Sequence, residues 1–244
     1  MNESEPDIGR RYLQQTRYSR AGLGEKRTSF PRAEPYKDYP SASQRVKLKP
    51  EISRQAADLW ECLRVRRSQR QYRDRPLSLA ELTDLVWAAQ GVTLAGRHYL
   101  LRTAPSAGAL YPVETYLAAY RVEGLDSGIW HLNIPNFELE LISVGDFRRV
   151  LVEAGIGQNF LGTAAAAFIW TGILNRAMWK YRERAIRYLF LDAGHICQNL
   201  MLAATALGLG CCPVGAFFDE EVERLIGVDG HDEVALYLAA VGPL

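Results

Sequence analysis

The longest regular pattern of apolar and polar residues lies between positions 184 and 207. From about Ala203 onward the segment is apolar on every side, which is typical of a helix buried in a core. At 1.5 Å per residue such a helix would be about 36 Å long, roughly the width of a small domain. We predict that it is the central element of the fold and that its helical region begins near residue 175. Its apolar residues recur at the three- and four-residue steps of one helix face: Ile186, Leu189, Phe190, Ala193, Ile196, Cys197, Leu200, Met201, Ala204 and Leu207.

Glycine marks the end of this predicted helix. Gly208 and Gly210 would stop it, and residues 211–216 follow as an extended turn of small side chains. One interpretation is a helix end that leads into a buried strand. A membrane-spanning helix is the other, because residues 193–218 carry no formal charge. Polar residues and helix breakers in that window argue against the span, and no membrane association is expected: His195, Gln198, Asn199, four glycines and Pro213.

Several shorter segments have the length and pattern of β-strands. In residues 137–142, Glu138 and Glu140 alternate with apolar residues, so one face of this strand is expected to face water. The almost uniformly apolar run 164–172 is expected to be a central buried strand. The remaining predicted strands are 113–122, 128–133, which would form a hairpin with 137–142, and 234–241.

The clearest helix start is a capping box at Ser78 and Glu81, followed by an apolar stripe that Gly91 closes. Three further helices are predicted at 52–63, at 146–154, and at 220–226, where Asp219 would be the cap and Gly227 the end. Helices and strands intermix without a regular βαβ alternation. The pattern therefore favours the α+β class over a doubly wound sheet.

The first 50 residues differ in composition from the rest of the chain. They hold 11 Lys and Arg against 6 Asp and Glu and show neither helical nor strand periodicity. Disorder is one interpretation. The other, which we favour because of five spaced aromatic residues, is an extended arm wrapped over the domain or over a dimer mate. The expected organisation is an arm at 1–50 and one domain at 51–244.

Composition limits the classes of function. The 244 residues are 48% hydrophobic, enough for a sizeable core, and the net charge of +1 gives no global attraction to nucleic acid or anionic membrane. The four cysteines form no C-x-x-C pair, which favours reduced thiols over a disulfide framework or a metal site. No secretory signal is recognisable at the N-terminus, so we expect a cytoplasmic location.

The densest positive patch contains six arginines between positions 64 and 75, with Ser68 among them. A guanidinium group donates two hydrogen bonds to two phosphate oxygens at once, so arginines beside a hydroxyl are suited to a phosphate monoester. A solvated charged turn and a nucleic-acid patch are the alternatives. With Tyr72 as its one aromatic residue, the patch gives little support to nucleic acid.

A second candidate segment, residues 102–112, consists of small residues between Pro105 and Pro112. Small side chains and hydroxyls allow a ligand to contact backbone amides directly. The same composition is equally common in tight turns, so the segment is not specific by itself.

Four segments, taken together in this order, resemble the nitroreductase-like flavoproteins, and most closely their SagB-type dehydrogenase branch. The resemblance covers roughly residues 56–242, and residues 16–20 of the arm are similar to what precedes the domain in that branch. The segments are 66–72, 103–112, 179–181 with 192–195 and 198–200, and 207–215.

The resemblance implies an α+β homodimer whose mostly antiparallel sheet is flanked by helices around one long buried helix, with FMN at the subunit interface. It implies that Arg66, Arg67, Ser68 and Arg70 hold the phosphate and ribityl chain. It also implies that a segment of the partner subunit lies against the flavin, that the turn after the long helix presents backbone to N5, and that Gln158 contacts the ring. In this sequence the first of those segments is Pro105, Ser106, Ala107 and Gly108, and the turn is Pro213, Val214, Gly215 and Ala216.

Lys180 and Tyr181 match a Lys-Tyr pair that azoline-oxidising members of the branch use as acid and base groups. A buried lysine, or the tyrosine beside it, would take a proton while hydride leaves to N5. The alternative is a surface helix whose Lys180 and Tyr181 side chains extend into solvent.

Two departures from the family pattern affect the expected site. The chain lacks the basic pair that familiar nitroreductases carry near the C-terminus, so phosphate binding would depend more on the arginines at 64–75. Ser106 is followed by Ala107 and Gly108 in place of an asparagine, which removes one expected hydrogen bond to the flavin.

The expected activity is that of an FMN-dependent oxidoreductase that transfers hydride through N5 and oxidises a peptide azoline or another small molecule. One alternative is an NAD(P)H-dependent reductase of nitroaromatics or quinones. The other is a flavin-binding partner subunit of a biosynthetic complex without turnover of its own.

Overall fold

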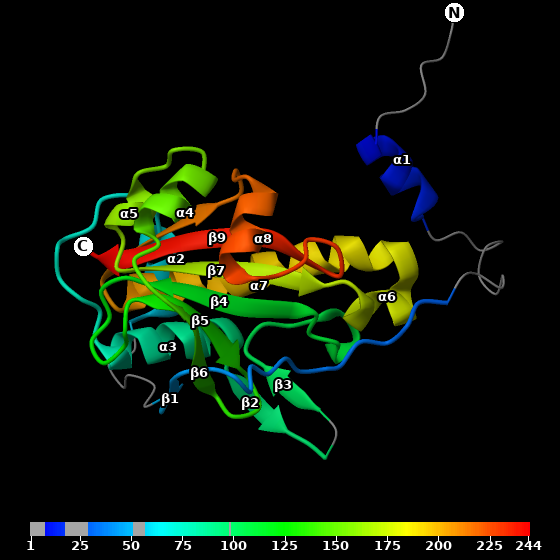
Figure 1. Ribbon diagram of the computed structural model, residues 1–244, viewed down its shortest axis with the longest axis horizontal. Helices are drawn as coiled ribbons and strands as arrows, with labels where there is room; N and C mark the ends of the chain where they lie inside the picture. Colours follow the sequence, from blue (N-terminus) through cyan, green and yellow to red (C-terminus); the bar gives the residue numbers. More distant parts are fainter. Residues whose placement is uncertain (1–7, 18–28, 51–56, 98) are drawn as a thin grey trace, which may run out of the picture.

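The computed structural model describes residues 8–17, 29–50, 57–97 and 99–244. Its centre is a seven-stranded sheet with the order β1-β6-β5-β4-β7-β9-β8, in which every ladder is antiparallel (Figure 1). A separate ladder joins β2 (Val92–Ala95) and β3 (Leu100–Arg102). The strands of the main sheet are β1 (Arg45–Lys47), β4 (Val113–Ala119), β5 (Gly128–Asn133), β6 (Glu138–Val144), β7 (Ala166–Ile173), β8 (Leu209–Val214) and β9 (Glu233–Pro243).

Helices cover both faces of this sheet, because alternate strand residues point to opposite sides and form two cores. On one side Leu85 of α3 (Leu79–Gln90) and Leu200 of α7 (Ala185–Ala206) pack with sheet residues such as Trp170. On the other side α4 (Arg148–Ala154), α5 (Phe160–Thr163) and α8 (Asp219–Ile226) pack around Ile169. The remaining helices are α1 (Ile8–Gln15), α2 (Leu59–Val65), η1 (Ala107–Ala109), α6 (Asn175–Tyr181) and η2 (Arg182–Arg184). The expected α+β class is confirmed.

The long buried helix is confirmed as α7, but it does not begin near residue 175. The chain breaks at Arg182, whose φ of 54° and ψ of −146° are incompatible with a helix, so α6 and α7 are separate helices. At the other end Gly208 adopts a φ of 67° and stops α7 as expected. Gly210 lies inside β8, so the interpretation of a helix end leading into a buried strand is confirmed.

Most of the other predicted elements are present. The apolar run at 164–172 forms β7, which lies between β4 and β9, and both hydrogen bonds of the Ser78–Glu81 capping box are made. The predicted helix at 52–63 is only partly present: α2 spans Leu59–Val65, Ala57 and Asp58 before it are not helical, and residues 51–56 lie outside the described residues. Asp219 is not the cap of α8. Phe218 occupies that position, and Asp219 lies in the first turn, where a carboxylate stabilises the positive end of the helix dipole.

The water-facing side expected for β6 is wrong. Glu140 has no exposed surface and Glu138 is 8% exposed. Residues 29–50 cross this face, and β1 within them pairs with β6, so that Arg45 forms an ion pair with Glu140. Alternation alone indicated a polar face but could not show that another segment of the chain covers it.

A buried network of charged residues lies beneath these covering residues. His131 contacts Glu114 and Glu140, each at 3.0 Å, and Arg176 forms an ion pair with Glu114. Burial alone would favour the neutral acid, but Arg176 and His131 outweigh it and hold the pKa of Glu114 at about 2. Lys37 covers the same face and forms a 2.5 Å ion pair with Glu233.

All four cysteines are buried with free thiols. Within the described ranges, no helix combines the length and the apolar character needed to cross a bilayer.

Candidate functional site

The arginine-rich segment lies against the outer edge of β8. Ser68 forms a parallel bridge with Cys211, and the backbone N–H of Gln69 donates to the carbonyl of Cys211 at 3.0 Å. Pro213 is tolerated in β8 because this strand is at the edge of the sheet, where a missing N–H disrupts no central ladder. Two segments that are more than 130 residues apart in sequence are thereby placed side by side.

The arginines of this segment fall into two groups. Arg64 is paired with Glu61 at 2.6 Å and Arg75 with Glu81 at 2.9 Å. By contrast, Arg66, Arg67 and Arg70 have no carboxylate partner among the described residues. Arg67 and Arg70 donate to backbone carbonyls, and Arg70 also lies over the ring of Phe160 at 5.6 Å. Guanidinium groups that lack a carboxylate partner within the described ranges are suited to binding an anion.

The exit of β8 adjoins the loop that carries Gln158. The Nε2 group of Gln158 donates to the carbonyl of Ala216 at 2.9 Å and to that of Gly155 at 2.8 Å. Gly215 is exposed, and a Cβ built on it would meet only Tyr237, at 3.8 Å. The backbone at Gly215 is therefore accessible. The structure brings Gln158 together with Pro213, Val214, Gly215 and Ala216, but the turn expected over 211–216 is strand β8 as far as Val214.

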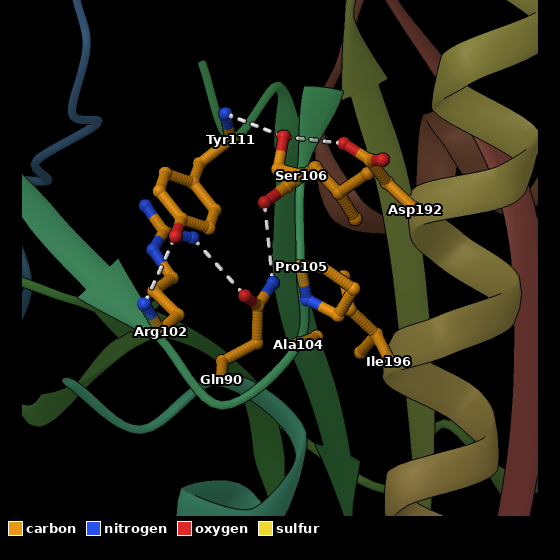
Figure 2. A pocket seen from close by; sticks show the side chains of 9 residues that line it. Gln90, Arg102, Ala104, Pro105, Ser106, Tyr111, Asp192 and Ile196 are labelled. Carbon is orange, nitrogen blue, oxygen red and sulfur yellow. Dashed lines mark hydrogen bonds between the residues drawn. The ribbon is translucent and has the colours of Figure 1, made fainter. Parts of the chain in front are cut away.

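The small-residue turn is held against α7 through the Ser106 hydroxyl. Ser106 Oγ donates to Asp192 Oδ2 at 2.5 Å and accepts a hydrogen bond from the backbone N–H of Tyr111 at 2.9 Å (Figure 2). The hydroxyl of Ser106 is thus engaged within the chain. Burial raises the pKa of Asp192, although the bonds from Ser106 and the N–H of Ala107 partly oppose this effect.

Three residues of this turn have positive φ angles: 62° at Gly108, 53° at Ala109 and 47° at Tyr111. Only glycine adopts this region without steric cost, so Ala109 and Tyr111 are held there by surrounding contacts. The hydroxyl of Tyr111 accepts from the N–H of Arg102 at 3.0 Å, and the Tyr111 ring lies 4.6 Å from the Arg102 guanidinium.

A second layer of polar residues lies behind the turn. Arg102 donates to Gln90 Oε1 at 3.1 Å (Figure 2). Gln90 in turn donates to the carbonyl of Val113 and to the hydroxyl of Thr115. Burial lowers the pKa of Arg102 to about 10. Arg102 and Tyr111 lie within the candidate segment 102–112 but were not predicted as site residues, and no pattern in the sequence pointed to Gln90. For Asp192 a signal existed, because it is an acidic residue among the buried positions of α7.

Lys180 and Tyr181 point toward the same turn. A Cβ built on Gly108 would lie 2.5 Å from Tyr181 Oη and 2.7 Å from Lys180 Nζ, which means that both polar groups approach the backbone of Gly108 closely. The ring of Tyr181 is fixed by an edge contact with Tyr188 at 4.9 Å. Lys180 remains exposed within a single chain, so the burial expected for it is not provided by this chain alone.

The predicted site residues therefore form two groups. The first contains Arg66, Arg67, Ser68, Arg70, Gln158 and the residues from Pro213 to Ala216, and the second contains Pro105, Ser106, Ala107, Gly108, Lys180 and Tyr181. Figure 1 shows the loop between α2 and α3 and helix α6 at opposite ends of the sheet. In the sheet, Cys211 and Ala166 of β7 both lie opposite Val241 of β9, whereas Val113, just after the turn, lies opposite Gly172 of β7. Ala166 and Gly172 are about 20 Å apart along β7, and the two groups are separated accordingly.

Comparison with known proteins identifies the family. The model of the nitroreductase family matches residues 63–243, which include both groups of site residues. The chain belongs to the nitroreductase family. Its α+β fold, with a mostly antiparallel sheet flanked by helices, is the nitroreductase-like fold that the sequence predicted.

Two relatives of this nitroreductase-family chain differ in how much of their length it spans. The nitroreductase homologue MJ1384 of Methanocaldococcus jannaschii is 35% identical over 72% of this chain and 86% of its own length. The trifolitoxin-processing protein TfxB of Rhizobium leguminosarum bv. trifolii is 32% identical over 58% of this chain, which covers only 39% of TfxB.

Among solved structures, the chain is similar to one in the Escherichia coli microcin synthetase McbBCD complex with truncated pro-MccB17 bound. The TM-score is 0.62 with 22% identity, over 83% of this chain and 79% of the other. At this identity the similarity concerns the fold. The family assignment supports an oxidoreductase.

Proposed function

We propose that this nitroreductase-family protein is an FMN-dependent oxidoreductase that resembles the SagB-type dehydrogenases and oxidises a peptide azoline or a related small molecule. The observation that carries the proposal is the position of Arg66, Arg67 and Arg70 beside β8, fixed by the bridge between Ser68 and Cys211. It supports a site in which an anion lies next to accessible backbone.

The residues present fit a flavin nucleotide. Three guanidinium groups without a carboxylate partner in the described part of the chain suit its phosphate, and the open backbone at Gly215 admits a flat ring close to the chain. When bound, FMN supplies hydride acceptance at N5. In this assignment Arg66, Arg67, Ser68 and Arg70 hold the phosphate and ribityl chain, and Gln158 and the residues from Pro213 to Ala216 hold the ring.

The chain's own acid and base groups are Lys180 and Tyr181. Their polar atoms lie together over Gly108, so either one can take a proton from a substrate placed against this turn. Asp192 orients the turn through Ser106, and the strained backbone from Gly108 to Tyr111 holds its shape. Lys180 and Tyr181 would hold or accept the proton of a substrate placed beside the bound flavin.

A homodimer would complete the site, because the two groups of residues lie at opposite ends of one chain. Helix α2 supports a second copy. It buries only Cys62, while Leu59, Trp60 and Leu63 are 56%, 76% and 45% exposed. A helix that leaves its apolar residues in water is stabilised by a partner surface. In the dimer, the arginine segment of one chain would meet the Ser106–Gly108 turn of its partner, giving two sites.

The alternatives differ in the role of Lys180 and Tyr181. A reductase of nitroaromatics or quinones would take electrons from NAD(P)H, whereas a partner subunit of a biosynthetic complex would bind flavin without turnover. The approach of both residues to Gly108 favours the dehydrogenase. The relative TfxB is a trifolitoxin-processing protein, and the McbBCD complex was solved with truncated pro-MccB17 bound. Both support a peptide as the class of substrate.

FMN titration of the purified chain, followed by the flavin absorbance of the protein fraction, tests the cofactor. A chain that retains no FMN would overturn the proposal.

Lys180→Ala and Tyr181→Phe should abolish oxidation of an azoline peptide while FMN stays bound. If both variants kept full turnover, the assigned acid and base roles would be wrong. Steady-state turnover with NADH or NADPH and a nitroaromatic acceptor would identify the reductase alternative.

A further inference from the structure

A cavity lies next to Lys180 and Tyr181, between the covering arm (residues 29–50) and the β2–β3 hairpin. It contains about 480 Å³ of open space, part of it continuous with solvent. Figure 1 shows residues from 29 onward running from α6 past β3 toward β1, which makes the arm one wall of this space. The principal side chains that line it are Arg32, Tyr36, Tyr99, Leu110, Tyr111 and Trp179.

The cavity is lined mainly by aromatic side chains, and one positive charge in the lining is available to a ligand. Its four aromatic rings come from the arm, the β2–β3 hairpin, the small-residue turn and α6. Two arginines are present, but Arg176 is neutralised by Glu114 and also donates to the carbonyl of Glu34 at 2.6 Å. Arg32 lies over the ring of Trp179 at 4.9 Å and has no carboxylate partner among the described residues. Its exposed guanidinium is therefore available to an incoming anion.

The cavity shares its walls with the proposed catalytic turn. Ala109 lines the cavity and directly follows Gly108, the residue that Lys180 and Tyr181 approach. The Cα atoms of these two neighbours are about 3.8 Å apart, so the cavity wall begins one residue from the proposed reacting groups. Trp179 immediately precedes Lys180 on α6. A substrate with its reacting group at Lys180 would extend into the cavity through its next few atoms.

We propose that this cavity is a substrate subsite for a planar aromatic group that carries a carboxylate, as in an aromatic amino acid or the C-terminal aromatic residue of a peptide. The inference rests on the proposed function, because it takes Lys180 and Tyr181 as the reacting end. The rings of Tyr36, Tyr111 and Trp179 would enclose the aromatic group. Arg32 would bind the carboxylate while it remains stacked on Trp179.

Isothermal titration calorimetry of the full chain with FMN added tests the subsite. The probes are N-acetylphenylalanine, its C-terminal amide and N-acetylalanine. We expect the acid to bind about tenfold more tightly than either of the other two, since one charged hydrogen bond or one enclosed ring is missing from each. Equal affinities for the acid and the amide would overturn the proposal.

The variant Arg32→Gln should weaken binding of the acid about tenfold and leave binding of the amide unchanged. Arg32 is exposed, so the variant should fold normally. Arg149→Gln is the matched control, because Arg149 is an exposed arginine on α4, away from the cavity. An unchanged acid affinity in Arg32→Gln would contradict the assignment.

Two further comparisons distinguish a peptide from a free acid as the ligand, and the subsite proposal from the proposed function. An acetylated peptide ending in phenylalanine that binds better than N-acetylphenylalanine identifies a peptide, and the reverse order identifies a free acid. Flavin absorbance is read in the same samples. Retention of FMN without preference for the acid would refute the subsite alone, whereas loss of FMN binding would refute the proposed function.

Discussion

Ser106 Oγ and Asp192 Oδ2 are 2.5 Å apart, although their residues are separated by 86 positions in the sequence. This bond ties the small-residue turn to the buried face of α7, where Asp192 is only 4% exposed. A carboxylate buried to this degree is costly unless it is hydrogen-bonded, so the bond determines the position of the turn and stabilises the helix that carries it.

The first prediction concerns this pair. Ser106→Ala and Asp192→Ala should each lower the free energy of unfolding by about 1–3 kcal/mol, because each leaves a buried polar group without its partner. The double variant should lose less free energy of unfolding than the sum of the two single losses, and the difference, the coupling energy, should be about 1 kcal/mol or more. Urea unfolding of the four proteins measures this cycle. Thr205→Ala is the control on the same helix, since its hydroxyl donates only to the Met201 carbonyl; additive losses at Ser106 and Asp192 would contradict the prediction.

The second prediction concerns Gly108. Gly108→Ala should lower the free energy of unfolding by about 1–2 kcal/mol through its left-handed φ alone, and the new Cβ would also displace Lys180 and Tyr181. Gly227→Ala is a matched control, because Gly227 has a φ of 75° but open space around it. Both variants should lose stability in thermal unfolding. Only Gly108→Ala should also lose turnover in azoline oxidation, and equal turnover in the two variants would show that Lys180 and Tyr181 are not needed in this position.

The third prediction separates the arginines of one segment. Arg66→Ala should weaken FMN binding by about 1.5–3 kcal/mol, the value of a hydrogen bond to a charged group. Arg64→Ala should leave the affinity nearly unchanged, because Arg64 is already paired with Glu61. Fluorescence titration with FMN measures both constants. A larger loss in Arg64→Ala would show that carboxylate pairing does not distinguish the phosphate-binding arginines.

The fourth prediction is a pH dependence. The pKa of Glu114 is held at about 2 in the fold, below its ordinary value of 4.5, so the unfolded chain binds the proton more readily. The stabilisation is therefore complete above about pH 4.5 and is lost as the pH falls toward 2. Glu114→Gln should lower the free energy of unfolding at pH 7 by about 3–5 kcal/mol, since Arg176 stays buried without its partner.

The same variant should flatten the acid dependence of stability below pH 4.5, which urea unfolding at several pH values measures. Glu153→Gln is the control. Glu153 is exposed on α4, and its ion pair with Arg149 is long, at 3.9 Å, and solvent-exposed. Loss of this carboxylate should therefore change the free energy of unfolding little. An acid dependence identical in Glu114→Gln and the unaltered chain would contradict the role assigned to Glu114.

Local patterns predicted the elements of the fold well where a single periodicity decides the structure. The length of α7, the buried strand β7 and the capping box at Ser78 all follow from spacing within one segment. The break at Arg182 did not, because nothing in its neighbours excludes a continuous helix. The burial of Glu140 depends on Arg45, which lies 95 residues away.

The candidate site shows the same division. Chemical type identified the arginine segment and the small-residue turn, but it could not show that Arg64 is neutralised while Arg66 is not. The hydrogen bond between Ser106 and Asp192, and the positive φ of Tyr111, arise from contacts between distant segments. The roles of all these residues in binding and turnover stay predictions.

Neighbouring segments cover the outer backbone edges of two strands of the main sheet: β1 pairs with β6, and the Ser68 segment lies beside β8. Unpaired backbone at a sheet edge is a template for association with other chains. A shortened protein that lacks the residues up to 50 would uncover both the rim of β6 and the carboxylates beneath it. Such a truncation would therefore aggregate more readily, even if every residue proposed to hold the flavin were left in place.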